Sequence, residues 1–415
     1  MKSVLKNKLY LATFTADMIS NFGDSLYYLA LMNYVLLLPN PSLGISLVTS
    51  SESLPLLTRF LMGMLADKTE KKIQTILGTQ LFRAVLYVIV GLSMGFTPAL
   101  WIVIVAVVAN LFADISGQYE SYLFTPLSLR IVLDEDREGA MAFRQAAGSI
   151  LQIGFQASGA MLIGLMTYQH LAFFNAGTFV ICVLITLGIR PALNKLLQDN
   201  PLKITQQEEA AKGLVDNLRR SLKDTLTTIK NVPVLQSSVF VIMGINAVGS
   251  TLDILVLATI KDFSDFIFIN PSATIATISI IFLVGNILGS LLCTSLFKHF
   301  EILPMLNMTL VLLVVFFTAL FFHQFYVAVL VIFPAAFVLG GGNPKFAALM
   351  YRVIPEEKLA TVGSGIDTVL TMGMVISKTV LSGLVLVLTA QQISLLYLLL
   401  SVGLLAYTIK NTAKS

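Results

Sequence analysis

Charged residues are scarce in this chain of 415 residues. Only 12% of the residues are Asp, Glu, Lys or Arg, and 56% are hydrophobic, whereas soluble domains carry about 25% charged residues. A soluble fold of this size needs more charge to cover its surface, so the composition excludes an ordinary cytosolic enzyme, a nucleic-acid-binding module and a disordered protein. We therefore expect the chain to cross a membrane repeatedly, with room for about a dozen helices of ~20 residues.

Cysteine and histidine are scarce as well, with two and three residues. Cys182 and Cys293 fall inside hydrophobic runs, where we expect buried free thiols rather than a disulfide framework. The histidines lack metal-ligand spacing, and the sequence shows no Ser-His-Asp or Cys-His pattern for catalysis and no Walker A loop for ATP. We expect no enzyme activity, no metal or other cofactor, no ATP use and no nucleic-acid partner.

Hydrophobic runs separated by charged or Pro/Gly-containing breaks predict twelve membrane-spanning helices. The runs cover residues 9–38, 42–66, 73–95, 98–118, 142–166, 170–189, 234–260, 272–297, 302–322, 326–349, 360–388 and 393–409. The expected domains are an N-terminal six-helix bundle at 1–190, a cytoplasmic linker at 191–232 and a C-terminal six-helix bundle at 233–415.

The distribution of basic residues predicts how these helices are oriented. With the N-terminus placed inside, only Lys261 of the 27 Lys and Arg residues falls in an outer connection. Arg59, Arg83 and Lys378 lie within runs, and the others fall on the inner side. Because basic residues accumulate on the cytoplasmic side of membrane proteins, both termini are expected in the cytoplasm.

The linker carries an amphipathic pattern. Apolar residues recur at helical spacing among charged ones, at Leu214, Leu218, Leu222, Leu226 and Ile229. This pattern predicts a helix that lies on the inner face of the membrane. A regulatory domain is the alternative, but the segment is too short to bury a core of its own.

Polar residues inside the runs mark a candidate site, because a charge at the centre of a span costs about 2.5–3.5 kcal/mol. Asp17, Asn21, Asp24 and Tyr28 share one face of the first predicted helix, which we expect to line a cavity. Asp24 lies near mid-depth, where an apolar surrounding favours the protonated carboxyl group. It can therefore exchange a proton for a cationic or polar substrate. A structural network paired to a basic residue is the alternative.

Further charged residues lie in the second, third and fourth runs. Arg83 keeps its proton and needs an anionic partner, for which Asp24, Glu52 or a substrate carboxylate qualify. Asp114 is placed near the inner end of the fourth run, where an interfacial structural role is favoured.

The second half contributes the intramembrane charges Asp253, Asp367 and Lys378. Asp367 and Lys378 lie about 16 Å apart along a helix, too far to pair directly, so Lys378 is a candidate substrate contact or counter-ion. The polar pattern of the first run, residues 17–24, returns with the same spacing at residues 246–253. Repeated halves are typical of secondary transporters, which bind substrate where the halves meet.

Glycines in the second half predict two local features. Gly285 and Gly289 form a small-xxx-small pattern that favours close packing of helices. Residues 340–344, Gly-Gly-Gly-Asn-Pro, are expected to break or bend the helix of the tenth run.

The connection after the second run reads Gly63-Met64-Leu65-Ala66-Asp67-Lys68-Thr69-Glu70-Lys71-Lys72. It resembles the Gly-x-Leu-Ala-Asp-Arg-x-Gly-Arg-Lys signature of the major facilitator superfamily, with Glu70 at the second glycine and lysines for arginines. The resemblance implies an all-α membrane protein with twelve transmembrane helices in two pseudo-symmetric six-helix bundles. It further implies a gating motif made of Gly63, Asp67, Lys68, Lys71 and Lys72, in which Asp67 meets the N-terminus of the eleventh helix and latches the outward-open state.

Residues 21–25 and 140–145 are similar to the branch of this family that contains macrolide and enterobactin exporters. On this resemblance we expect a monomeric, proton-coupled exporter of small amphipathic, drug-like compounds in the plasma membrane of a bacterium. In this hypothesis the transporter works by alternating access, and Asp24, helped by Asp17, carries the protons. Cavity-lining roles are assigned to Glu52, Arg83, Asp253 and Lys378. Uptake or flipping of a nutrient or lysophospholipid by the same fold, and a non-transporting receptor or scaffold, are the alternatives.

Overall fold

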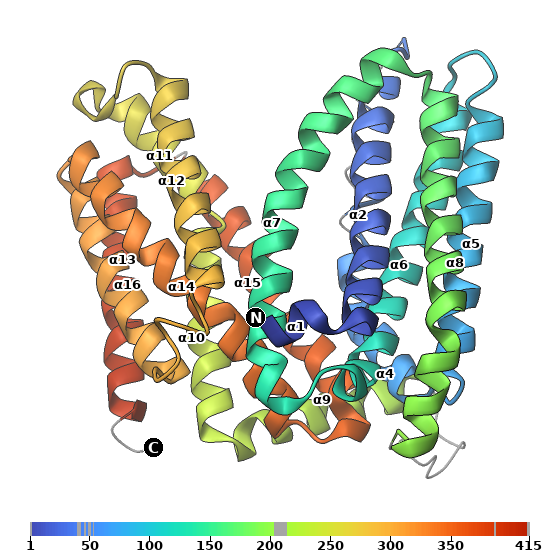
Figure 1. Cartoon of the computed structure of the whole chain (residues 1–415). Coiled ribbons are helices and arrows are strands. Elements are labelled where there is room, and N and C mark those ends of the chain that lie inside the picture. The colour runs from blue at the N-terminus through green and yellow to red at the C-terminus, as the bar shows by residue number, and fades with distance from the viewer. Residues whose placement is uncertain are drawn as a thin grey trace. The chain divides into compact units, whose positions relative to one another are not determined.

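The structure is a computed structural model that describes residues 2–39, 43, 44, 47, 48, 51, 52, 54–202, 214–385 and 387–412. Every regular element in these residues is helical (Figure 1). The prediction of an all-α chain is therefore confirmed. The chain divides into two compact units, and each includes a short segment from the other half of the sequence.

The first unit comprises Met1–Asp136, Ala147–Thr225 and Ile354–Gly365. The helices of the first half are α1 (Lys2–Lys6), α2 (Lys8–Val35), η1 (Leu54–Thr58), α4 (Arg59–Lys68), α5 (Lys72–Ser93), α6 (Leu100–Ile131), α7 (Asp134–Leu165) and α8 (Tyr168–Asp199). Helix α8 packs against α2 and α5, and α5 packs against α6. A cluster of three aromatic rings is fully buried among them, with Tyr87 stacked on Phe179 and in edge contact with Tyr27, because large apolar rings gain most from close packing.

The second unit comprises Arg137–Ala146, Leu226–Val353 and Ile366–Ser415. The helices that follow α8 are α9 (Leu214–Asn231), α10 (Pro233–Gly249), α11 (Leu252–Asp262), η2 (Ser264–Phe266), α12 (Pro271–Leu291), α13 (Ile302–Phe321), α14 (Phe325–Val353), η3 (Glu356–Lys358), α15 (Leu359–Leu384) and α16 (Ala390–Thr412). Helix α14 packs between α12 and α13, and α13 packs against α16. The side chains of Phe316 and Phe317 are fully buried.

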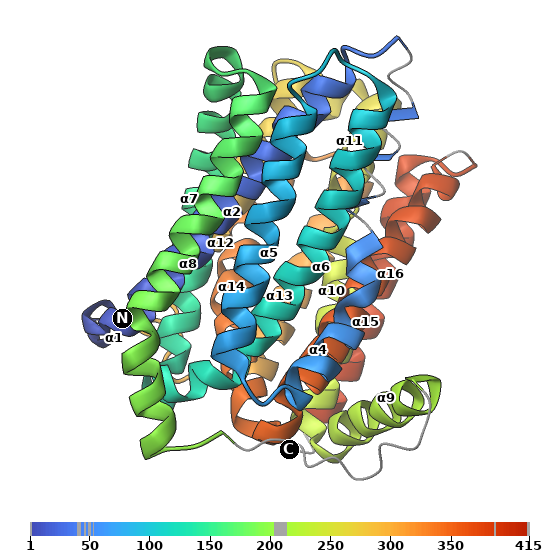
Figure 2. The ribbon, with the colours of Figure 1, turned by 90° about the vertical axis from the view of Figure 1, so that its right-hand side faces the viewer.

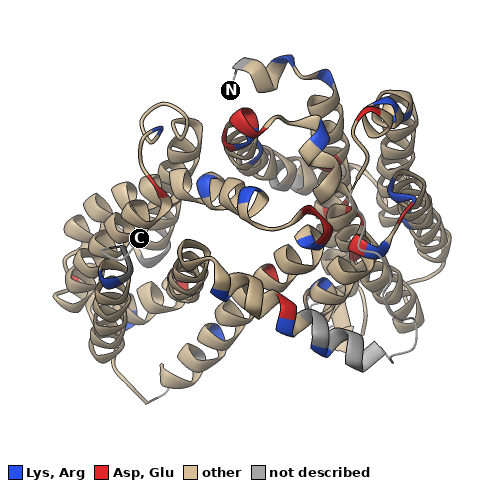
Figure 3. Cartoon of the chain, turned by 90° about the horizontal axis from the view of Figure 1, so that it is seen from below, with Lys and Arg blue, Asp and Glu red and all other residues tan. Residues whose placement is uncertain are grey.

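Nine helical segments of the described residues are long and apolar enough to cross a membrane. They correspond to nine of the twelve predicted runs, and the first, second and fifth runs correspond to α2, to η1 with α4, and to α7. The amphipathic helix predicted in the linker is present as α9, which lies crosswise to the long helices of the first unit (Figure 2). Seen from below, acidic and basic residues are found at helix ends and connections (Figure 3).

Two helices extend past their predicted ends. Helix α6 continues to Ile131, well beyond the predicted end at Gln118, because the polar residues that suggested a break lie within the helix. Helix α8 likewise runs through Pro191 to Asp199. Polar residues that were expected in connections therefore lie on helices α6 and α8.

Residues 340–344 were expected to break or bend the helix of the tenth run; the break is wrong, and a bend stays a prediction. Helix α14 runs from Phe325 to Val353 and contains both Pro334 and Pro344. The glycines of α14 instead allow close contact with the neighbouring helix α12.

Helices α12 and α14 approach each other through glycines. A Cβ atom at Gly340 would collide with the backbone of Asn286, and one at Gly289 would collide with the carbonyl group of Phe337. The hydroxyl of Ser290 donates to the carbonyl of Gly340 at 2.9 Å. The close packing predicted for the small residues of α12 is therefore confirmed.

The seventh predicted run is divided into α10 and α11 by a turn at Ser250 and Thr251. The Thr251 hydroxyl lies 2.9 Å from the hydroxyl of Tyr397 on α16. Asp253 falls in the first turn of α11, where the helix dipole favours a negative charge. The polar pattern that repeats that of α2 thus spans a helix break instead of one continuous face.

Candidate functional site

Arg83 on α5 is the centre of a polar cluster in the first unit, and it is 5% exposed. Its Nη2 donates to Oδ2 of Asp24 on α2 at 2.7 Å. Its Nη1 donates to the hydroxyl of Ser20 at 3.3 Å and lies 3.8 Å from Oε2 of Glu120 on α6. The other carboxylate oxygen of Glu120 accepts from Gln80 at 2.7 Å. Among the partners that the sequence left open for Arg83, the structure favours Asp24.

Hydrogen bonds extend from Asp24 to two further acids. The hydroxyl of Tyr87 lies 3.5 Å from Oδ1 of Asp24 and 3.2 Å from Oδ1 of Asn110, so its proton can be donated to either. The Asn110 amide donates to Oε1 of Glu52 at 2.8 Å and lies 3.2 Å from Oδ2 of Asp114. Asp24, Glu52 and Asp114 are thus connected through one phenol and one amide.

Close helix packing positions the guanidinium group. The ring of Phe179 on α8 lies 4.1 Å from Cζ of Arg83, a cation–π distance. A Cβ atom at Gly117 would come within 3.2 Å of the guanidinium, so glycine at this position leaves room for it. A Cβ atom at Gly23 would collide with the Thr178 hydroxyl, and its absence lets α2 approach α8 one residue before Asp24.

The cluster contains more acid than base. The guanidinium of Arg83 balances one of the four carboxyl groups of Asp24, Glu52, Asp114 and Glu120. Like charges that are this close and partly buried are stable only when protons or a bound cation compensate them. The arrangement is therefore suited to holding protons or a cation.

The predicted polar face of α2 enters this cluster only in part. Asp24 is a member, and Ser20, which the sequence interpretation passed over, is a second one. Tyr28 is half-buried and packs against the core of the first unit. Asp17 is half-buried and Asn21 is exposed.

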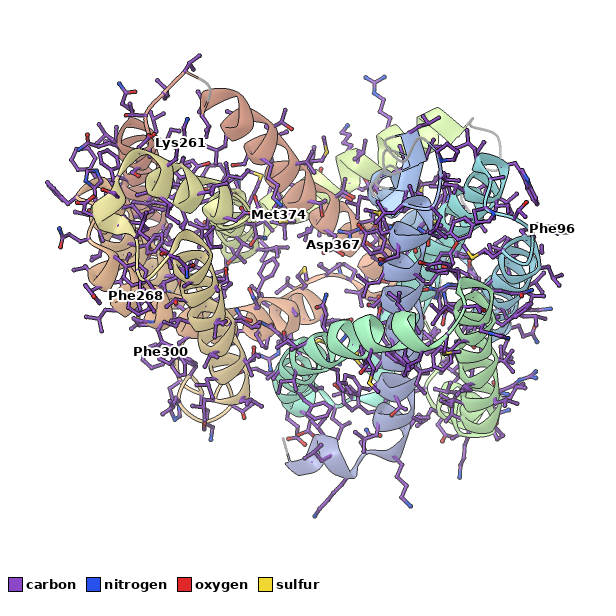
Figure 4. The ribbon with its side chains drawn as sticks, turned by 90° about the horizontal axis from the view of Figure 1, so that it is seen from above. Phe96, Lys261, Phe268, Phe300, Asp367 and Met374 are labelled. Atoms are coloured by element: carbon purple, nitrogen blue, oxygen red, sulfur yellow. The ribbon has the colours of Figure 1, made fainter. Side chains whose placement is uncertain are left out.

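The predicted site residues of the second half lie in the second unit. Asp367 on α15 is half-buried, with Met374 two turns further along the same helix (Figure 4). Asp253 and Lys378 are exposed. Their participation in a substrate site stays a prediction.

The motif at the end of α4 contacts the start of α15. The two carboxylate oxygens of Asp67 accept from the backbone N–H groups of Ala360 and Thr361 at 3.1 and 2.6 Å. The first N–H groups of a helix have no partner within it, and its dipole favours a negative charge there. A Cβ atom at Gly63 would collide with the Ala360 carbonyl and the Ser364 hydroxyl, so glycine permits this approach.

The lysines of the motif have different surroundings. Lys72 is buried and its ammonium group donates to the carbonyl of Ala66, Lys68 is half-buried, and Lys71 is exposed. Burial raises the pKa of Asp67 to about 6, although its hydrogen bonds to α15 and the charge of Lys72 act in the opposite direction. The gating role of the motif stays a prediction.

A second ionic contact lies beside this one. The Nη2 atom of Arg130 on α6 lies 2.7 and 3.0 Å from the carboxylate oxygens of Glu356 in η3. Both side chains are largely buried. Arg130 also donates to the backbone carbonyls of Asn200 and Pro201. The C-terminal end of α6 is thus held to the residues that follow α8 and to the segment that precedes α15.

The sequence interpretation missed the contribution of α6. Asp114 was expected near a helix end, which is wrong because α6 continues to Ile131 and Asp114 lies in its interior beside Asn110. Glu120 fell outside the predicted span for the same reason. The interfacial structural role of Asp114 stays a prediction. A signal was present, since Asn110, Asp114, Gly117 and Glu120 are spaced by three or four residues and share one side of a helix.

Comparison with known proteins identifies the fold. A family model described as Major Facilitator Superfamily matches residues 9–378. A bacterial homologue of the iron transporter ferroportin in an outward-facing state is similar with a TM-score of 0.69 and 15% identity, covering 98% of this chain and 100% of that chain. The proton:xylose symporter XylE gives a TM-score of 0.60 at 13% identity (96% and 95% covered). FucP in the outward conformation gives 0.59 at 10% identity (97% and 99% covered). No curated protein sequence matches. The predicted architecture of twelve membrane helices in two six-helix bundles agrees with these findings.

Proposed function

This chain belongs to the Major Facilitator Superfamily, and on that premise we propose that it is a proton-coupled secondary transporter in a cell membrane. The proposed activity is efflux of small amphipathic cations by alternating access, in exchange for protons. The solved relatives that share its fold include a transporter that moves its substrate together with protons.

The observation that carries the proposal is the acid-rich cluster around Arg83. Asp24 lies on α2, Asp114 and Glu120 lie on α6, and Glu52 precedes η1. Hydrogen bonds and ion pairs connect these acids through side chains of the same unit. Ionisable groups within membrane spans are costly and are retained where they move ions or bind substrate. The excess of carboxyl groups over guanidinium favours protons and cations as the transported species.

Arg83 supplies a means of coupling. It lies 2.7 Å from Asp24 and 3.8 Å from Glu120, so a small rotation of its side chain exchanges the closer partner. When Asp24 takes up a proton, Arg83 shifts toward Glu120. When a cationic substrate arrives, it competes with that proton for the Asp24 carboxylate. Proton and substrate then occupy the site in alternation, as exchange transport requires.

The contact between Asp67 and α15 is the proposed gate. Its hydrogen bonds to Ala360 and Thr361 hold the start of α15 against α4. The Arg130–Glu356 pair reinforces the same attachment. Alternating access requires that such contacts break in one state and re-form in the other, and we assign this role to both.

Inverted membrane vesicles with an imposed pH gradient test the proposal, with ethidium as the cationic probe. The wild-type protein should accumulate ethidium when the vesicle interior is acidic, and Asp24→Asn should not, at equal protein abundance. Asp199→Asn is the control, because Asp199 is an exposed acid at the end of α8. Gradient-driven uptake by D24N at the wild-type rate would remove Asp24 from the mechanism.

A metal cation is the second candidate for the transported species. Glu52 and Asp114 offer carboxylate oxygens, which hard cations prefer as ligands, although the described residues contain no group of three or more His, Cys, Asp or Glu side chains that could hold a metal ion. One solved structure of similar fold is described as a homologue of an iron transporter. Uptake of radioactive Fe²⁺ or Mn²⁺ by the same vesicles separates the two candidates.

Orientation and direction are part of the proposal. The excess of Lys and Arg in the connections on one side favours both termini in the cytoplasm. Transport measured in right-side-out and inverted vesicles distinguishes export from uptake of a nutrient or lysophospholipid. Absence of substrate-stimulated proton flux across a broad compound panel would favour a receptor or scaffold.

A further inference from the structure

Helix α9 has an apolar edge that the described residues of the chain leave exposed. Leu222 and Leu226, one turn apart, are 48% and 54% exposed. Thr225 and Ile229, on the adjacent edge, are 3% and 8% exposed. The side chains of Leu214 and Leu218, which the sequence places on the same stripe, lie outside the described residues. Among the described residues, α9 therefore has a buried edge at Thr225 and Ile229 and an uncovered edge at Leu222 and Leu226.

The orientation of α9 is fixed by contacts on its other side. The carboxylate of Asp224 lies 3.0 Å from Nζ of Lys358 in η3. A Cβ atom at Gly365 on α15 would come within 2.8 Å of Thr225, which shows how closely the two helices approach. Because Asp224 and Thr225 are held by protein, the helix cannot rotate to bury Leu222 and Leu226 without losing these contacts.

Basic residues border the uncovered leucines. Arg219, Lys223 and Lys230 are exposed. At about 100° per residue they lie roughly 20–60° beyond Leu226 around the helix axis, on the side away from Thr225. Long basic side chains beside an apolar stripe can place their charges at lipid headgroups while the stripe enters the boundary of the acyl chains.

The position of α9 in the chain places it at a membrane surface. It ends at Asn231, and the membrane-spanning helix α10 begins at Pro233. Helix α9 also lies crosswise to the long helices of the first unit (Figure 2). We propose that α9 docks on the membrane surface through Leu222 and Leu226, with Arg219, Lys223 and Lys230 binding the headgroups of anionic phospholipids. The proposal does not depend on the transport activity.

Spin labelling in nanodiscs tests the docking. Cys182 and Cys293 are buried, so a nitroxide reagent should label a new surface cysteine selectively, with the unmodified protein as the labelling control. Leu226→Cys places the label on the uncovered edge, and Thr227→Cys is the matched control about 100° away around the helix. In nanodiscs with phosphatidylglycerol, the L226C label should be more accessible to oxygen than to a water-soluble nickel complex. The T227C label should show the opposite preference.

The lipid charge is tested with the same label. Arg219→Gln, Lys223→Gln and Lys230→Gln combined should move the L226C label toward water, as should replacing phosphatidylglycerol with phosphatidylcholine. Equal accessibility of the two labels to the nickel complex would overturn docking. So would protection of L226C from both reagents, or spin–spin broadening between labels, which would show that protein covers the edge. A label depth independent of phosphatidylglycerol would overturn the recognition of anionic lipid.

Discussion

At the scale of single residues, the proposed function depends on the charge balance around Arg83. The guanidinium contacts Asp24 and lies near Glu120, Phe179 packs on its face, and Gly117 leaves room for it. Intramembrane charge alone was sufficient to predict Asp24 and Arg83 as site residues. It could not show which acid Arg83 contacts, because pairing depends on how α2, α5 and α6 pack, and spacing along one helix contains no information on that.

Removal of Arg83 should destabilise the protein, because its carboxylate neighbours would lose their counter-charge. We expect Arg83→Gln to cost about 3–5 kcal/mol, the usual effect of breaking a buried ion pair from one side. The double variant R83Q/E120Q should regain part of this loss, since it removes one uncompensated acid. Thermal unfolding of the detergent-solubilised protein measures both. Equal melting temperatures of the single and double variants would contradict the assigned charge balance.

Asp67 predicts a pH dependence of stability. Burial raises the pKa of its carboxyl group from 3.8 to about 6 in the folded protein, so the folded state binds a proton more readily than the unfolded chain does. The contribution of Asp67 to the free energy of unfolding is therefore complete below about pH 4 and declines as the pH rises to about 6.

The difference in melting temperature between the wild-type protein and Asp67→Asn measures this contribution. The melting temperature of the wild-type protein minus that of Asp67→Asn should fall between about pH 4 and about pH 6 and stay constant at higher pH. Glu70→Gln, a change at an exposed neighbouring acid, should show no such shift. A difference that is flat or that rises with pH would show that the hydrogen bonds to α15 outweigh the burial of Asp67.

At the scale of helices, glycine determines which elements can approach each other. Helix existence was predictable from hydrophobic runs, and the break within the seventh run and the ends of α6 and α8 were not. Polar residues end a run by composition, but they continue as helix when neighbouring helices supply partners, as Gln80 does for Glu120. The glycines of α14 indicated a break for the same reason, since composition does not distinguish flexible backbone from a surface of close contact.

Gly289→Ala should destabilise the second unit by about 1–3 kcal/mol, the usual range for overpacking. The added Cβ atom would collide with the carbonyl of Phe337 on α14. Gly403→Ala on α16 is the matched control, because nothing lies within 4 Å of a Cβ atom there. The control should be neutral or slightly stabilising, since alanine favours helix. Equal melting temperatures of the two variants would show that α12 and α14 can separate without cost.

At the scale of the whole molecule, each compact unit contains a segment from the other half of the sequence. Residues 137–146 belong to the second unit, and residues 354–365 belong to the first. The Arg130–Glu356 contact was not visible in the sequence, because pairing between distant segments is a property of the folded chain.

This attachment can be tested by exchanging the charges. Arg130→Glu and Glu356→Arg should each release the start of α15, which would appear as faster amide hydrogen exchange of residues 356–361. The double variant R130E/E356R should restore part of the protection, because opposite charges again face each other. Additive effects of the two substitutions would contradict a direct role of the pair.

The most direct test of the proposed transport is substrate-dependent proton movement in proteoliposomes that contain the pH dye pyranine. An ethidium gradient, with no pH gradient imposed, should drive protons in the opposite direction through the wild-type protein and not through D24N. Ethidium flux without proton movement in the wild-type protein, or equal proton movement in D24N, would contradict exchange through the Arg83 cluster.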